Sequence, residues 1–183
     1  MRILQVINTL YTGGAEKLLI DVTPLYEKES IEIEVLSLKN DKSSFWKSLE
    51  VNFFGNIYGL TTGSIYNPFL IFKIIPYLKN YDIIHIHLFP SLYWVVIAKW
   101  ITFSKVKIVY TEHSTSNRRR NIFLFKVLEK IVYSKLDAVV TISYEVDKNL
   151  KKHLSLPNLK LKLINNGVDV HYYNTINPYP KEL

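Results

Sequence analysis

The sequence of 183 residues contains no cysteine. This absence excludes disulfide bonds, a thiol nucleophile and a cysteine-ligated zinc site, and it suits a cytoplasmic protein. Acidic residues are also scarce, because 16 of them stand against 23 lysines and arginines, which gives a formal net charge of +7. The excess of positive charge favours a negatively charged partner, which could be nucleic acid, anionic lipid or a phosphorylated ligand.

An uninterrupted membrane-spanning run is missing as well. The most apolar stretch, residues 83–103, is long enough to cross a bilayer, but it contains His85, His87, Pro90 and Lys99. We therefore interpret it as a strand, a turn and a helix. The amino-terminal run MRILQVIN is too short for the apolar region of a signal peptide, so we expect no export.

Helical and strand patterns alternate along the chain. Hydrophobic residues make up 48% of it, which is enough for a sizeable core. Short β-branched runs predict strands at 2–7, 31–38, 51–58, 82–87, 106–112, 137–142 and 160–164. Amphipathic runs predict helices at 14–29, 66–80, 91–103, 120–136 and 143–154. This alternation predicts an α/β fold with a doubly wound, mostly parallel sheet of about seven strands and helices on both faces.

The segments that look like motifs all follow predicted strands. In an open parallel sheet, ligands bind outside the carboxyl ends of the strands, where the loops into the following helices gather. Five polar or glycine-containing segments occupy such positions: NTLYTGGAE, HLFPS, EHSTSNRRR, SYEV and NNGVD. We therefore expect the binding site at that edge of the sheet.

Gly13 and Gly14 lie between the first predicted strand and the first predicted helix. Successive backbone N–H groups at a helix start, with no side chain in the way, can bind a phosphate or a sugar hydroxyl. The segment matches neither the dinucleotide-binding nor the P-loop glycine pattern. The alternative, which is slightly favoured for the segment taken alone, is a turn with Glu16 in the first helical turn, where the helix dipole favours negative charge.

Three histidines are predicted to lie near one another. His85 and His87 are two residues apart on a strand and so point to the same face, and His113 lies at the end of the next strand. Together they could bind a metal ion. We favour the alternative of a buried histidine and a second one that faces the cleft, because no carboxylate is arranged to orient metal ligands.

The segment after His113 is rich in hydroxyl groups and positive charge. Ser114 and Thr115 can hydrogen-bond a polyol, and Arg118 to Arg120 can pair with a phosphate group. The alternative for the arginines is a solvated flank of the following helix. Because positive charge at a helix start opposes the helix dipole, the arginines modestly favour an anionic partner.

The helix predicted at 120–136 is amphipathic. Phe123 and Phe125 fall outside its main apolar stripe, beside Lys126 and Lys130. We favour packing of these side chains against neighbouring helices, and contact with an anionic membrane is the alternative. The residues expected to face the core are Leu124, Leu128, Ile131 and Val132.

The last part of the chain has the composition of a turn and a linker. Asn165, Asn166 and Gly167 predict a turn, and the run TINPYPKEL follows it. Two prolines and several polar residues predict the start of an interdomain linker over 175–183, so that residues 1–174 form one domain. We expect a second domain that this chain does not contain.

Taken in order, these segments resemble family 4 glycosyltransferases of the GT-B type. GGAE is similar to the glycine loop of that family, and DIIHIH, TEHS, AVVTIS and INNGVD match its later amino-terminal motifs, over residues 1–174. The resemblance implies two Rossmann-like domains that face each other across a cleft. This chain would be the acceptor-side domain, and the absent carboxyl-terminal domain would bind the donor.

The resemblance also implies an activity and roles for residues. The enzyme would transfer a sugar, with retention of configuration, from a UDP- or GDP-sugar to a glycan, a lipid-linked acceptor or a small molecule, without a metal ion or other cofactor. His113 would be catalytic and contact the transferred sugar, and Gly13 and Gly14 would approach the donor diphosphate. The residues that would bind the acceptor or the sugar are His87, Ser114, Thr115 and Asn166.

One feature of the family's donor half is missing. That half carries a Glu-x7-Glu motif, but no two glutamates in this chain are eight residues apart. We therefore expect the isolated chain to be inactive. Two other classes stay open, a GT-B-type nucleotide-sugar 2-epimerase and a non-catalytic module that binds glycan or anionic lipid, and metal-dependent hydrolysis ranks last. We expect a cytoplasmic protein, with peripheral contact at the inner membrane face as one option, and no nucleic-acid partner.

Overall fold

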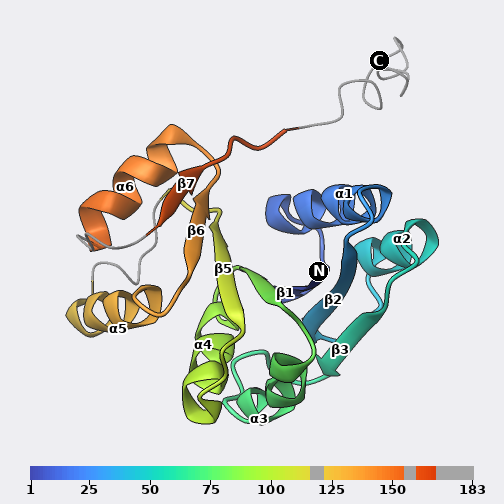
Figure 1. Ribbon diagram of the computed structural model, residues 1–183, viewed down its shortest axis with the longest axis horizontal. Coiled ribbons are helices and arrows are strands. Elements are labelled where there is room, and N and C mark those ends of the chain that lie inside the picture. Colours follow the sequence, from blue (N-terminus) through green and yellow to red (C-terminus); the bar gives the residue numbers. More distant parts are fainter. Residues whose placement is uncertain (116–121, 155–159, 168–183) are drawn as a thin grey trace, which may run out of the picture.

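Seven parallel strands form one sheet in the order β3-β2-β1-β4-β5-β6-β7 in the computed structural model, which describes residues 1–115, 122–154 and 160–167 (Figure 1). The strands are β1 (Arg2–Ile7), β2 (Glu32–Lys39), β3 (Ile57–Thr61), β4 (Ile83–His87), β5 (Lys107–Glu112), β6 (Ala138–Thr141) and β7 (Leu161–Leu163). The helices are α1 (Gly14–Lys28), α2 (Ser44–Asn52), α3 (Leu70–Ile74), the 3-10 helix η1 (Ile75–Lys79), α4 (Ser91–Thr102), α5 (Phe123–Tyr133) and α6 (Tyr144–Leu154). The predicted doubly wound sheet is confirmed.

The strand order reverses between β1 and β4, because the chain crosses from β3 at one end of the sheet to the far side of β1. Helices α1 and α2 cover one face of the sheet, and α3, η1, α4, α5 and α6 cover the other (Figure 1). Since ligands of such folds bind at the point of reversal, the carboxyl ends of β1 and β4 are the expected location of a site.

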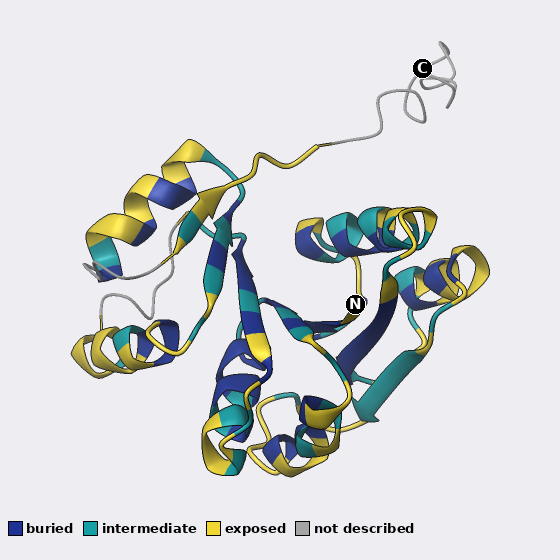
Figure 2. Ribbon diagram, viewed as in Figure 1, coloured by how far each residue is buried: buried dark blue, intermediate teal, exposed yellow. Residues whose placement is uncertain are grey.

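Alternate residues of the central strands enter two separate cores. Leu4 and Val6 of β1 pack under α3 and α4, whereas Ile3 and Ile7 pack under α1 and α2. Figure 2 accordingly shows β1 and β2 as largely buried. The same alternation in β4 sends Ile84 and Ile86 into the first core, whereas Ile83 packs against the second, so the two histidines of β4 point to the face that carries α1.

The region of the third predicted strand differs from the prediction. Residues 44–52 form helix α2, and the strand begins only at Ile57. Helix α2 starts at Ser43, whose Oγ accepts a hydrogen bond from the backbone N of Trp46 at 3.4 Å and donates one to Leu10 O at 2.5 Å. This capping, together with the burial of Trp46, which is 1% exposed, stabilises a helix that the sequence pattern did not predict.

Two predicted helices are shorter than expected. The helix predicted at 66–80 begins at Leu70 and becomes 3-10 at Ile75, because Pro76 has no N–H to continue the α-helical bonding. Helix α5 begins at Phe123, and residues 120–121 of its prediction lie outside the described part of the chain.

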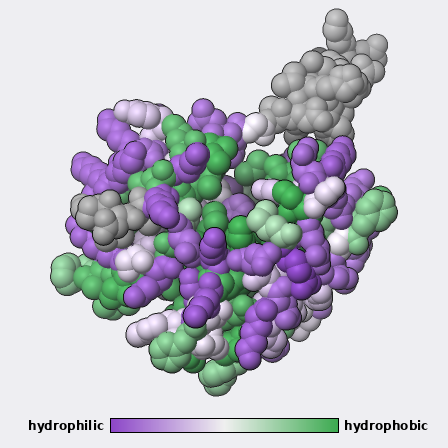
Figure 3. Space-filling view, in the orientation of Figure 1, coloured by the Kyte–Doolittle hydropathy of each residue, from purple (hydrophilic) through white to green (hydrophobic). Residues whose placement is uncertain are grey.

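Helix α5 turns a different face to the core than its sequence pattern predicts. Of the four residues expected there only Val132 is buried, and it is joined by Glu129 and Tyr133. His153 Nε2 donates to Glu129 Oε2 at 2.7 Å, and the Tyr133 hydroxyl donates to Glu112 Oε2 at 2.6 Å. These bonds allow polar groups to be buried. As a result, apolar side chains remain exposed on the surface of α5, where Figure 3 shows an apolar area. The exposed residues of this helix include Leu124, Leu128 and Ile131.

The apolar stretch 83–103 folds as predicted, into strand β4, a turn and helix α4. No helix in the described ranges is both long enough and apolar enough to cross a membrane.

Candidate functional site

Because all the strands are parallel, the segments that follow them lie together at one edge of the sheet, the edge formed by the carboxyl ends of the strands (the carboxyl edge). Gly13 is the N-cap of α1, with no side-chain hydrogen bond to cap the helix, and its carbonyl accepts from Lys17 N at 2.8 Å. The Glu16 side chain folds back over Gly13, so that a Cβ there would collide with its carboxylate. Burial raises the pKa of Glu16, and a hydrogen bond from its own backbone N–H opposes the shift. An anion that bound this helix start would compete with Glu16.

Two of the predicted site residues are in direct contact. His87 Nδ1 lies 3.1 Å from His113 Nε2, within hydrogen-bonding distance, and the two ring centroids are 5.4 Å apart. The other nitrogen of His87, Nε2, bonds to Gln5 Oε1 at 2.7 Å. The ring centroid of the neighbouring His85 lies 4.5 Å from that of His87, with the ring planes tilted by 41°, and His85 Nε2 bonds to Thr111 Oγ1 at 2.7 Å. The predicted histidine cluster therefore forms, with His87 buried at its centre.

The three histidines are uncharged near neutral pH. Burial lowers the pKa of His113 to about 4, and burial together with repulsion from His113 lowers the pKa of His85 to about 4. Burial, followed by repulsion from the other two rings, brings the pKa of His87 well below its usual value. A neutral imidazole has one N–H donor and one lone pair, so each ring can both donate and accept a hydrogen bond.

The turn after His87 is held in a strained conformation. Leu88 has a φ of 65°, a left-handed conformation that is costly for a bulky side chain. Asn8 Nδ2 donates to Phe89 O, and Asn8 Oδ1 accepts from Ser91 N at 3.1 Å. Ser91 Oγ donates to His87 O at 2.6 Å. Strain that surrounding hydrogen bonds maintain in this way is characteristic of functional sites.

The remaining predicted residues lie at the same edge of the sheet without joining the histidine pair. The backbone N of Ser114 donates to Glu112 Oε1 at 3.1 Å, and Thr115 O accepts from Asn149 Nδ2 at 3.3 Å. Asn166 is exposed, and its backbone N donates to Ile142 O at 3.3 Å. The arginines at 118–120, the end of the NNGVD segment and the linker at 175–183 lie outside the described residues.

The three-histidine metal site does not form in the described ranges. No group of three or more histidine, aspartate or glutamate side chains there is placed to hold a metal ion. The ring nitrogens that bond to Gln5 and Thr111 are already engaged within the protein.

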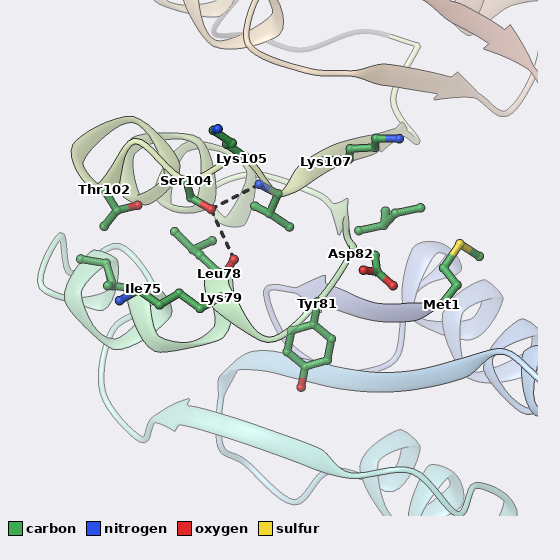
Figure 4. A pocket seen from close by; sticks show the side chains of 12 residues that line it. Met1, Ile75, Leu78, Lys79, Tyr81, Asp82, Thr102, Ser104, Lys105 and Lys107 are labelled. Carbon is green, nitrogen blue, oxygen red and sulfur yellow. Dashed lines mark hydrogen bonds between the residues drawn. The ribbon is translucent and has the colours of Figure 1, made fainter.

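A pocket of about 760 Å³ lies at the opposite edge of the sheet, where β1, β4 and β5 begin (Figure 4). Its lining includes Met1, Asp82 and Lys107, and Ser104 closes one side by donating to Leu78 O at 3.3 Å. None of the predicted site residues lines this pocket. It is therefore separate from the carboxyl edge.

Sequence reasoning missed two polar residues that build the carboxyl edge. Gln5 interrupts the apolar run of β1 and is 1% exposed, and Asn8 follows the same strand and is buried. The sequence did contain a signal for Gln5. A polar side chain in a strand that is covered on both faces needs a buried hydrogen-bond partner.

Comparison with known proteins identifies similar sequences and structures. The family profile described as Glycosyltransferase Family 4 matches residues 12–172. The structure of Anabaena Alr3699/HepE in complex with UDP and glucose is similar, with a TM-score of 0.75 and 21% identity over 94% of this chain and 46% of that chain. A glycosyltransferase from Rickettsia africae ESF-5 has a TM-score of 0.74 and 23% identity over 98% of this chain and 46% of that chain.

A third similar structure is the lipopolysaccharide outer core galactosyltransferase WaaB in its apo form, with a TM-score of 0.68 and 15% identity over 93% of this chain and 47% of that chain. The chain therefore spans about half the length of these solved structures and shares the fold of that half. The search of curated proteins found no match.

Proposed function

The chain belongs to glycosyltransferase family 4, and we propose from this premise that it is the acceptor-side half of an enzyme that transfers a sugar from a nucleotide sugar to an acceptor hydroxyl. A donor-binding domain would follow it in the whole protein. The donor is proposed to be a UDP- or GDP-sugar, and the structure of Alr3699/HepE with UDP and glucose supports a uridine-linked one. The acceptor is a glycan, a lipid-linked sugar or a small molecule.

The observation that carries the proposal is the contact between His87 and His113 at the carboxyl edge of the sheet, beside the point where the strand order reverses. His113 is a neutral, partly exposed imidazole at the end of β5. His113 would hydrogen-bond the sugar during transfer, and the hydrogen bond with His87 would fix the position of the His113 ring. Ser114, Thr115 and Asn166 would contact the acceptor or the sugar.

The proposed reaction retains the configuration of the sugar. The bond from its anomeric carbon to the donor diphosphate breaks, and the acceptor oxygen bonds to that carbon on the same face. The acceptor's proton leaves on the released diphosphate. Backbone N–H groups at Gly13 and Gly14 would stabilise the negative charge that develops on the diphosphate, because oriented amides at a helix start favour an anion.

The proposal is tested with the whole gene product and, separately, with the 183-residue chain. The whole product is incubated with radiolabelled UDP- and GDP-sugars and a panel of glycan and lipid-linked acceptors. We expect labelled acceptor and free nucleotide diphosphate from the whole product and neither from the chain alone. Interconversion of free nucleotide sugars without labelled acceptor would support a 2-epimerase instead, and the absence of any turnover with binding of glycan alone would support a non-catalytic module.

We also propose that the protein is cytoplasmic and contacts an anionic membrane through α5. The outward face of this helix exposes Phe123 at 81% and Leu124 at 64%, with Ile131 about two turns further along. Lys126 and Lys130 flank the apolar side chains. A helix with apolar residues outward and lysines beside them suits the interface of a bilayer with negatively charged headgroups. Such contact would bring a lipid-linked acceptor to the carboxyl edge.

Replacing Phe123 and Leu124 by glutamate is expected to lower co-sedimentation of the chain with phosphatidylglycerol vesicles about tenfold or more. Each substitution removes an apolar side chain worth about 1.5–3 kcal/mol of burial and adds a repelled charge. The matched control is Phe54→Glu, because Phe54 is 98% exposed and follows α2, away from α5. Equal sedimentation of both variants, or no sedimentation of the parent chain, would exclude α5 as the membrane contact.

A further inference from the structure

We propose that Gln5 is a positioning residue, which acts through His87 to fix the nitrogen of His113 that carries the proton. The inference rests on the proposed role of His113 in transfer. It adds a residue from the centre of β1, two strand positions before the strand ends, to the site at the carboxyl edge.

The direction of the hydrogen bonds follows from the chemistry of the side chains. Gln5 Oε1 can only accept, so the bond of 2.7 Å requires the proton of His87 to be on Nε2. In the neutral ring, His87 Nδ1 then has the lone pair. The bond of 3.1 Å to His113 consequently requires the proton of His113 to be on Nε2. His113 Nδ1 is left with a lone pair.

The surroundings of these linked hydrogen bonds keep the His87 ring uncharged. Gln5 is 1% exposed and His87 is 3% exposed, and burial opposes protonation of His87. The third histidine, His85, bonds to Thr111 and is not one of the residues in the series of hydrogen bonds from Gln5 through His87 to His113. Because the buried amide of Gln5 would cost free energy without a partner, its place in the otherwise apolar run Ile3–Ile7 is explained by the bond to His87.

The consequence is a preference for one kind of ligand group at His113. A lone pair on Nδ1 accepts a hydrogen bond from a hydroxyl but repels the oxygens of a phosphate or carboxylate. His113 is therefore prepared to bind a sugar hydroxyl, whereas the diphosphate of the donor belongs at the start of α1. His113 would thus select the sugar of the nucleotide sugar, and the start of α1 would select its diphosphate.

The experiment is long-range ¹H–¹⁵N correlation of the ¹⁵N-histidine-labelled chain at pH 7, which reports the protonated nitrogen of each ring. We expect His87 and His113 each to be protonated on Nε2. Gln5→Met keeps the approximate size of the side chain and removes the acceptor, so His87 and His113 should change to a mixture of tautomers. The control Thr111→Val removes the neighbouring bond to His85 and should leave His113 as in the parent.

A proton on Nδ1 of His113 in the parent chain would overturn the proposal, and so would unchanged tautomers in a folded Gln5→Met variant. If that variant does not fold, the parent spectrum alone decides. The spectra need neither donor nor acceptor. An inactive whole gene product with the expected tautomers would therefore contradict the proposed function and leave the role of Gln5 intact.

Discussion

Replacing His113 by alanine in the whole gene product is expected to lower turnover about 100-fold or more. In the proposed function this imidazole contacts the transferred sugar, and its hydrogen bond to His87 orients it. A loss of orientation at a reacting centre costs roughly 100-fold in rate. The fold should survive, because the side chain is partly exposed and a typical hydrogen bond contributes about 1 kcal/mol. Initial rates of transfer and thermal unfolding of the 183-residue chain measure the two effects separately.

His153 provides a matched histidine control. Its Nε2 donates to the buried carboxylate of Glu129 at 2.7 Å, between α6 and α5. His153→Ala should lower the free energy of unfolding by about 1–3 kcal/mol, because a buried carboxylate loses a donor. Turnover per folded molecule should stay at the parent level. Full turnover after His113→Ala, or an equal loss after His153→Ala, would contradict the assignment of His113.

The sheet was predictable because its signal is local and repeated. Runs such as DIIHIH and KVKIVYT combine β-branched residues with polar boundaries, and strands alternate with helices throughout. Once the strands are parallel, their carboxyl ends must lie at one edge. His87 approaches His113 because β4 and β5 are neighbouring parallel strands, with His87 opposite Thr111 and His113 just beyond the end of β5.

The errors at α5 and α2 lie where distant side chains determine the outcome. Periodicity in α5 places leucines in the core, but burial of Glu129 and Tyr133 depends on His153 and Glu112, which come from other elements. Helix α2 depends likewise on a bond from Ser43 to Leu10 in the loop after β1. No local pattern reports such partners, because each pair is separated by more than 20 residues.

In the candidate site, too, local features could be predicted from the sequence and long-range contacts could not. The positions of the glycines and of His113 at strand ends could be read from the sequence. Gln5 could not be assigned, because a single polar residue in a strand does not say which side chain it meets across 82 positions. The protonation of His113 is a property of that long-range contact and could only be inferred from the structure.

Replacing Gly14 by alanine is expected to separate folding from catalysis. Gly14 is the first residue of α1 and has no positive φ, and an added Cβ would meet no atom within 4 Å. Because alanine favours a helix by up to about 1 kcal/mol over glycine, the melting temperature of the chain should stay the same or rise. Turnover of the whole gene product should fall about 100-fold, because a methyl group would displace the donor diphosphate by roughly 1 Å. Thermal unfolding and donor saturation curves provide the measurements.

The choice of Gly14 over its neighbour makes this test decisive. A Cβ on Gly13 would collide with Glu16, so a loss of activity there would mix two causes. Gly63→Ala is the matched control, since its Cβ would meet only Thr61 Oγ1, at 3.4 Å, in the loop after the outermost strand β3. It should leave turnover at the parent level. Unchanged donor saturation and turnover after Gly14→Ala would contradict the proposed approach of the donor diphosphate to the backbone at Gly14.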